Sequence, residues 1–124
     1  MRDAVLVALF GGAGCLARYG LSSAVQGASG RSFPLGTLVV NVAGAFLIGL
    51  VMELSHRHGW VSPSLRLALV TGFLGGFTTF SAFSYETVRL LQSGEHGAAA
   101  LNAAGSVAAC LASTVAGLAA ARHL

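Results

Sequence analysis

The chain has 124 residues, of which 55% are hydrophobic and only 9% are charged, and its formal net charge is +3 at pH 7. An average soluble domain has about 25% charged residues, so this composition excludes an ordinary soluble protein and predicts a membrane protein. The basic residues are all arginines, and they are spread along the chain rather than clustered. This distribution argues against a nucleic-acid-binding surface.

The first apolar segment runs uncharged from Ala4 to Ala17, meets Arg18 and continues as "YGLSSAVQGASG". It is long enough to cross a bilayer in spite of its single charge. A cleaved signal peptide is the alternative, and "GGAGC", ending at Cys15, faintly resembles a lipoprotein cleavage site. Asp3 spoils the positive leader of such a signal, and Gly12 replaces the large apolar residue that these sites prefer. We therefore expect a first transmembrane helix.

Three further segments contain no charged residue: Leu35 to Met52, Leu67 to Tyr85 and Gly97 to Ala121. Each reaches the length of about 18 residues that a membrane helix needs. The connections between them are short and polar. The sequence therefore predicts an all-α membrane protein in which residues 1–124 form a single domain of four transmembrane helices.

The arginines give the predicted bundle only a weak orientation. If the helices alternate in direction, one side of the membrane carries Arg2, Arg57, Arg66 and Arg122, and the other carries Arg31 and Arg89. This is a shallow positive-inside bias. A chain with so little preference can insert both ways, which permits an antiparallel dimer of identical subunits.

The third segment, from about Ser64 to Leu91, would be about 42 Å long as one straight helix at 1.5 Å per residue. The hydrocarbon core of a bilayer is only about 30 Å thick. The run "GGFTT", Gly75 to Thr79, offers a break in the helix: the glycines permit it, and Thr78 and Thr79 can satisfy backbone groups locally. A simple packing notch of two glycines is the alternative. If the break exists, its carbonyls can bind a cation.

The fourth segment combines two periodic patterns. Small residues recur every four positions at Gly105, Ala109, Ser113, Gly117 and Ala121. This pattern lets helices approach closely in lipid, and Gly72 and Gly76 repeat it in the third segment. A polar stripe follows at Asn102, Ser106, Cys110 and Thr114. Uncharged donors in such a stripe suit an anion that must be held and then released.

Other candidates lie in the first three segments. Asn41 is in the middle of the second, one turn after Thr37, where an amide is costly without a partner, so an interhelical hydrogen bond is the simplest expectation. Phe80 and Phe83 share one face after the predicted break, and their positive ring edges could attract a small anion, although ordinary apolar packing is commoner. Arg18 is either a structural or vestibule residue or an arginine that extends to the interface.

The cysteines and histidines indicate no metal centre. Cys15 and Cys110 lie in apolar segments without a Cys-x-x-Cys pattern, so we expect neither a disulfide nor a zinc site. The histidines fall in predicted turns or at the tail, at His56, His58, His96 and His123.

Three runs, "GGAGCLARY", "PLGTLVVNVAGAFLIG" and "GFLGGFTTFSAFSYE", resemble the signature segments of the bacterial CrcB/Fluc fluoride channels, and the resemblance covers essentially the whole chain. It implies a fluoride-selective channel in the bacterial inner membrane that lets cytoplasmic fluoride leave passively and so lowers its toxicity. It also implies an antiparallel, dual-topology homodimer with two fluoride pathways and a structural sodium ion at the dimer interface.

The resemblance also assigns roles to residues. It implies that backbone carbonyls of Gly75 and Thr78 hold the sodium. Phe80, Phe83 and Asn41 match fluoride-pathway positions, and Arg18 matches the arginine of the first helix. The polar track of the fourth helix maps to Asn102, Ser106, Cys110 and Thr114. Here the chain departs from relatives, in which tyrosine or hydroxyl residues can stand where this chain has asparagine and cysteine.

Other function classes fit less well. A small four-helix proton-coupled exporter needs an acid in the middle of a span, whereas all four acids are expected at span ends or in turns: Asp3, Glu53, Glu86 and Glu95. A non-conducting assembly subunit would explain the glycines but not the aligned polar stripe. No nucleophile and base pair at catalytic spacing, so we expect no enzyme.

Overall fold

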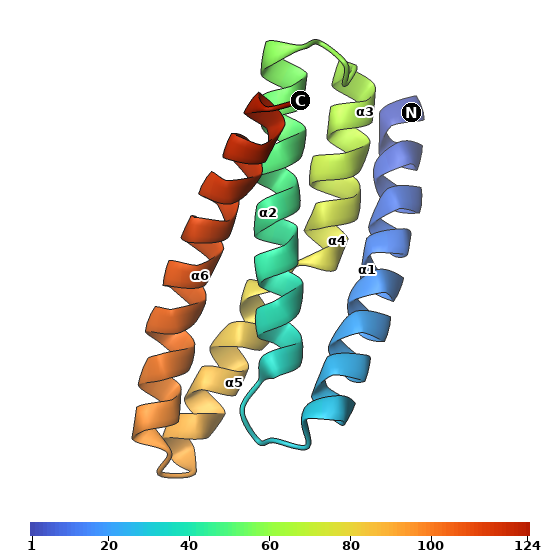
Figure 1. Ribbon diagram of the computed structural model, residues 1–124. Helices are drawn as coiled ribbons and strands as arrows, with labels where there is room; N and C mark the ends of the chain where they lie inside the picture. The colour runs from blue at the N-terminus through green and yellow to red at the C-terminus, as the bar shows by residue number, and fades with distance from the viewer.

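The computed structural model describes residues 1–124 as an all-helical bundle with both termini at the same end (Figure 1). Its elements are α1 (Arg2–Ser29), α2 (Leu35–Arg57), α3 (Pro63–Leu67), the π-helical segment η1 (Ala68–Leu74), α4 (Gly75–Phe77), α5 (Phe80–Gln92) and α6 (His96–Arg122). Helices α3 to α5 together form one span, Pro63–Gln92, and four spans are long and apolar enough to cross a membrane. The prediction of four helices long and apolar enough to cross a membrane is confirmed.

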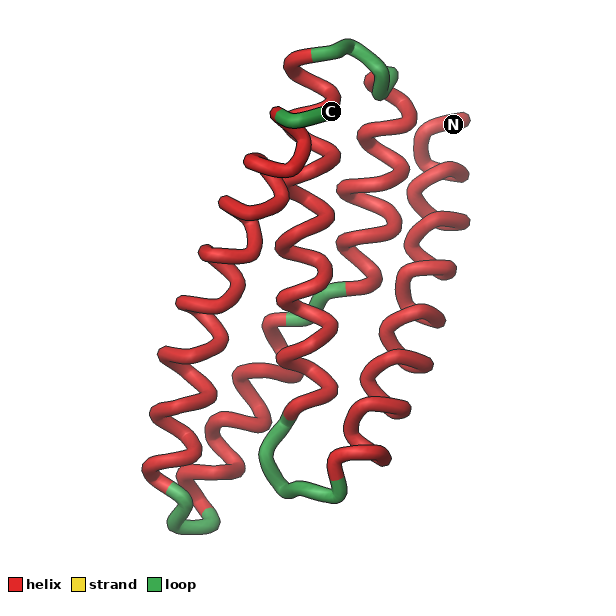
Figure 2. The backbone as a smooth tube through the Cα atoms, viewed as in Figure 1, coloured by secondary structure: helices red, strands yellow, loops and turns green.

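The third span changes neighbours halfway along its length. Its first half, up to α4, packs against α1, whereas α5 packs against α6, and α2 runs between the two sides (Figure 1). The tube in Figure 2 shows the non-helical step between α4 and α5 near the middle of the bundle. The break therefore moves the span from one side of α2 to the other.

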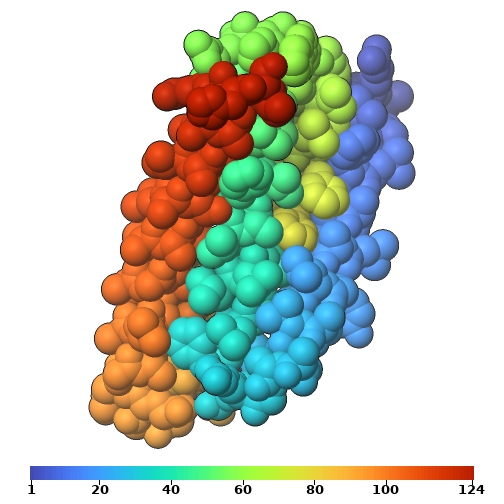
Figure 3. Space-filling view, in the orientation of Figure 1, coloured from blue at the N-terminus to red at the C-terminus, as the bar shows by residue number.

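Glycines let the helix backbones touch. A Cβ atom on Gly49 would collide with the Thr114 carbonyl, and one on Gly117 would collide with the Phe46 carbonyl, so α2 and α6 meet backbone to backbone. Figure 3 shows α2 lying directly against α6 on this face. The predicted small-residue packing of α6 is confirmed at Gly117, because close approach requires a missing side chain, but a Cβ on Gly105 would meet only Leu101 of the same helix.

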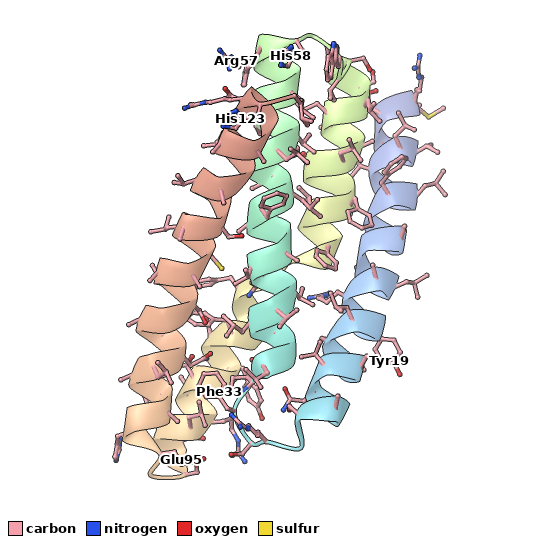
Figure 4. All side chains as sticks on the ribbon, viewed as in Figure 1. Tyr19, Phe33, Arg57, His58, Glu95 and His123 are labelled. Atoms are coloured by element: carbon pink, nitrogen blue, oxygen red, sulfur yellow. The ribbon has the colours of Figure 1, made fainter.

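Charged and titratable side chains mark the two ends of the bundle. Figure 4 shows Arg57, His58 and His123 at one end and Glu95 at the other. At the first of these ends Glu53 accepts a hydrogen bond from the Arg122 guanidinium at 3.0 Å, which ties α6 to α2. Charged ends and an apolar middle are what a bilayer imposes on a spanning bundle.

Candidate functional site

The break in the third span is two residues long. Thr78 and Thr79 have extended backbone torsions (φ −88°, ψ 160° and φ −152°, ψ 120°). The predicted break of Gly75 to Thr79 is therefore wrong in its extent, because Gly75 has helical torsions (φ −61°, ψ −38°). Gly76 is also in α4, where a Cβ would collide with the Gly11 carbonyl of α1. These glycines continue the helix, and at Gly76 the reason is close packing.

The two threonines satisfy backbone groups around the break, as the sequence predicted. The Thr78 hydroxyl donates to the Leu74 carbonyl at 2.8 Å. The Thr79 hydroxyl accepts the Ala82 N–H at 3.2 Å and so caps the first turn of α5. A threonine that accepts such a bond is a good N-cap, which is why α5 restarts at once after the break.

Asn41 of α2 holds the break from the side. The Thr79 N–H donates to Asn41 Oδ1 at 2.8 Å, and Asn41 Nδ2 donates to the Thr79 carbonyl at 2.9 Å. The side-chain amide thus bonds to both backbone groups of Thr79, and at the N–H it replaces the helical bond to the Gly75 carbonyl that the break removes. The expected interhelical hydrogen bond of Asn41 is confirmed, and its partner is the break itself.

A cavity of about 480 Å³ lies beside the break, between α2, the third span and α6, and no lining residue carries a charge. Eight of the ten residues singled out from the sequence line it: Asn41, Gly75, Thr78, Phe80, Phe83, Ser106, Cys110 and Thr114. Asn102 and Arg18 do not. The cavity offers hydroxyl, thiol and amide groups and aromatic rings, a lining suited to a small ion that loses its water without meeting a fixed charge.

The phenylalanines lie together at this cavity. Their ring centroids are 5.4 Å apart and their planes are tilted by 45°, so Phe80 and Phe83 share one face as predicted. The Phe80 residue is 77% exposed in the single chain. An aromatic ring so exposed beside a polar break leaves this side of the cavity open.

The polar stripe of α6 is hydrogen-bonded within the chain. Asn102 is 2% exposed and Ser106 is 7% exposed. The Ser106 hydroxyl donates to Asn102 Oδ1 at 3.3 Å, and Asn102 Nδ2 donates to the Thr87 hydroxyl at 2.9 Å. The Thr114 hydroxyl donates to the Cys110 carbonyl of its own helix at 3.1 Å. The stripe therefore faces the bundle, and Asn102 supports the cavity from one turn beyond Ser106.

Arg18 lies apart from the cavity. It is half-buried on α1, and its guanidinium lies 3.9 Å from the Cys15 sulfur. No residue of α1 lines the cavity. A role for Arg18 as a structural or vestibule residue stays a prediction.

Glu86 is the functional candidate that the sequence analysis placed wrongly. It lies inside α5 rather than at a span end or in a turn, and it is half-buried. The Thr37 hydroxyl donates to Glu86 Oε1 at 2.8 Å, while Oε2 is buried without a partner. The signal was spacing: Glu86 follows Phe83 by three residues and Thr37 precedes Asn41 by four, so each shares a helix face with a cavity residue.

Comparison with known proteins gives consistent matches. The family model described as CrcB-like protein, Camphor Resistance (CrcB), matches residues 5–118. The chain is 56% identical over 124 residues to the "Fluoride-specific ion channel FluC" of Geobacter sulfurreducens and 57% identical over 124 residues to that of Geobacter metallireducens. It is 54% identical over 124 residues to the protein of the same name from Geotalea daltonii. Each alignment covers 100% of both chains.

Proposed function

This chain belongs to the CrcB family and is a fluoride-specific ion channel rather than an enzyme, and we propose that fluoride crosses it through the cavity beside the break. The single observation that carries the assignment of the path is the lining: uncharged donors from α2 and α6 face an aromatic pair on α5. A fixed positive charge would hold an anion too tightly, whereas several weak donors allow binding and release.

The transport is passive and follows from acid–base chemistry. Hydrogen fluoride is a weak acid that crosses membranes uncharged and dissociates in a near-neutral cytoplasm, which leaves fluoride trapped inside. A channel lets the ion leave down its own gradient. A membrane potential that is negative inside adds about 2.3 kcal/mol per charge per 100 mV. We expect the channel to lower fluoride toxicity in this way, from the inner membrane of a bacterium.

The two sides of the cavity play different parts in this path. On α6 the thiol of Cys110 is a hydrogen-bond donor, and the hydroxyls of Ser106 and Thr114 would have to turn from Asn102 and from the Cys110 carbonyl to donate to the ion. On α2 the Asn41 amide has a second N–H. On α5 the ring edges of Phe80 and Phe83 carry partial positive charge. Spacing that suits the small fluoride ion would leave chloride, which is larger, poorly coordinated. Asn102 contributes by holding Ser106.

The break is suited to hold a structural sodium ion. In an unbroken helix the Thr79 N–H would bond to the Gly75 carbonyl and the Ala82 N–H to the Thr78 carbonyl. Here Asn41 takes the first N–H and the Thr79 hydroxyl takes the second. Carbonyl oxygens released from the helix are ligands that sodium accepts. The carbonyls of Gly75 and Thr78 would hold the ion. The ion would link the carbonyls electrostatically and would take part in no reaction.

A second copy of the chain would complete the site. Non-helical backbone at membrane depth must be covered by protein or by a wet cavity, yet Gly75, Phe80 and Ser81 are exposed in the single chain. Two copies related by an axis in the membrane plane would bring their breaks together at mid-depth and pair the free carbonyls around one sodium. The weak charge bias of the arginines supports such an antiparallel homodimer in dual topology.

Fluoride efflux from liposomes that contain only the purified protein tests the proposal. We expect fluoride efflux to exceed chloride efflux strongly, and Phe80→Ile to lose most of the fluoride flux because an aliphatic side chain has no positive ring edge. Phe33→Ile, in the loop between α1 and α2, is the matched control and should conduct as the wild type does. Equal fluoride and chloride rates would refute selectivity, and flux that depends on a proton gradient would favour an exporter.

A further inference from the structure

The hydrogen bonds between Asn41 and Thr79 are reciprocal. A backbone N–H can only donate and a backbone carbonyl can only accept, so the pair fixes which way the Asn41 amide points: Oδ1 takes the Thr79 N–H and Nδ2 gives to the Thr79 carbonyl. Both distances, 2.8 and 2.9 Å, are in the range of well-formed hydrogen bonds. Asn41 therefore supplies a fixed donor and a fixed acceptor from α2 to the break.

The acceptor end of this amide decides the state of the Gly75 carbonyl. Gly75 has helical torsions, and a Cβ there would meet only the Val70 carbonyl, at 3.8 Å. Nothing in the glycine itself prevents the helix from continuing through Thr79 and closing the bond from the Thr79 N–H to the Gly75 carbonyl. Asn41 Oδ1 competes for that N–H. When Asn41 holds it, the Gly75 carbonyl lacks its helical donor.

We propose that Asn41 is a positioning residue for the cation site: by holding the Thr79 N–H, its amide oxygen keeps the Gly75 carbonyl free to bind sodium. The inference rests on the sodium site proposed above, and it adds that a residue of α2, which contributes no oxygen to the ion, maintains that site. Without the amide oxygen, the Thr79 N–H and the cation compete for one carbonyl.

The same residue can serve the anion path without releasing the break. A side-chain amide has two N–H bonds, and one of them donates to the Thr79 carbonyl. The other is available to the cavity that Asn41 lines. An anion therefore competes only for the donor end of Asn41, while the acceptor end goes on holding Thr79. The cation site stays intact as ions pass.

The test uses two substitutions that separate the two ends of the amide. Asn41→Leu removes both ends, and Asn41→Asp keeps an acceptor for the Thr79 N–H while adding a negative charge. Thermal unfolding of the purified full-length protein would be followed as sodium replaces N-methyl-glucamine at constant ionic strength. The wild type should be stabilised, with a half-saturating sodium concentration that rises about 10- to 100-fold in Asn41→Leu, the range for one polar contact to a charged group.

Asn41→Asp should keep the sodium response and lose fluoride flux, because a carboxylate accepts from Thr79 but repels an anion. Thr37→Val is the matched control: it removes a hydroxyl of α2 that bonds to α5 without touching Thr79, and it should keep the sodium response. A wild-type sodium response in Asn41→Leu would overturn the inference, and so would loss of the sodium response in Asn41→Asp. If Asn41→Leu does not fold, Asn41→Asp remains as the test. A wild type without any response to sodium would instead refute the sodium site itself.

Discussion

The two halves of the third span are held by different forces. The first half packs on α1 through backbone contacts: a Cβ on Gly14 would collide with the Phe73 carbonyl, and one on Gly76 would collide with the Gly11 carbonyl. The second half, α5, is held by side-chain hydrogen bonds to α2 and α6, which Asn41, Thr37 and Asn102 make. The first half is thus held by close backbone packing, and the second half by side-chain hydrogen bonds.

This difference explains where the proposed ion path lies. Lipid gives helices no hydrophobic reason to associate, so the first half depends on close van der Waals packing. Polar groups at membrane depth must find partners, and on the α5 side those partners come from α2 and α6. An ion that loses its water needs replaceable polar contacts, and the break, α2 and α6 offer them beside α5. The cavity lies where the two halves meet.

The strongest test of the comparison is to add volume to the first half. Gly76→Val would place a side chain on the Gly11 backbone of α1, which cannot move aside as a flexible side chain would. We expect a loss of stability of about 3 kcal/mol or more, seen as little or no monodisperse protein in gel filtration. Gly12→Val is the matched control, since a Cβ at Gly12 of α1 would meet nothing within 4 Å. If Gly76→Val folded as well as Gly12→Val, the first half would not depend on backbone contact.

The spans could be predicted from the sequence because hydropathy and length decide them locally. The three uncharged runs lie within α2, the third span and α6, and the segment with Arg18 is helical as predicted. Five of the eight predicted cavity residues came together because their spacing places them on single helix faces, Phe80 and Phe83 on α5 and the other three, Ser106, Cys110 and Thr114, on α6. Helix periodicity is enough to find such faces.

The extent of the break and the place of Glu86 could not be read in the same way. Glycine has a low helix propensity, so the predicted break began at Gly75. In the structure α1 packs against Gly76, where the helix continues, and Asn41 holds Thr79, where it is broken. Both causes come from other helices. Glu86 seemed to end a span because charge is costly in lipid, yet Thr37 supplies a hydrogen bond. The sequence does not show which partners the fold provides.

A reagent directed at Cys110 of α6 tests whether the ion passes through the cavity beside α5. Cys110 lines the cavity, whereas Cys15 is exposed on α1 outside it. A bulky methanethiosulfonate should block most of the fluoride efflux from liposomes by filling the path. Cys110→Ala should conduct and resist the reagent although it keeps Cys15, and Cys15→Ala should stay sensitive. Block that persists in Cys110→Ala would place the effect outside the cavity.

The smallest effect is expected at Thr87, which bonds to Asn102 and, through it, supports the cavity residue Ser106. Thr87 does not line the cavity; its hydroxyl accepts from Asn102 Nδ2 at 2.9 Å and donates to the Phe83 carbonyl at 2.8 Å. Because that hydroxyl is already donating to Phe83, Asn102 must turn its NH₂ to Thr87 and its oxygen to Ser106. Thr87→Val removes the acceptor, so the amide is free to reverse and the Ser106 hydroxyl turns to the cavity.

We therefore expect Thr87→Val to bind fluoride more tightly and release it more slowly. The half-saturating concentration and the maximal efflux should both fall by about 2- to 10-fold, the worth of one neutral hydrogen bond. Concentration-dependent efflux from liposomes measures both. Thr87→Ser should behave as the wild type does, and Ser84→Ala, which removes the same kind of bond to the Phe80 carbonyl, should leave half-saturation unchanged. A Thr87→Val channel with lower maximal efflux but normal half-saturation would mean that Thr87 only stabilises α5, and that the direction of the hydrogen bonds behind Ser106 does not matter to the ion.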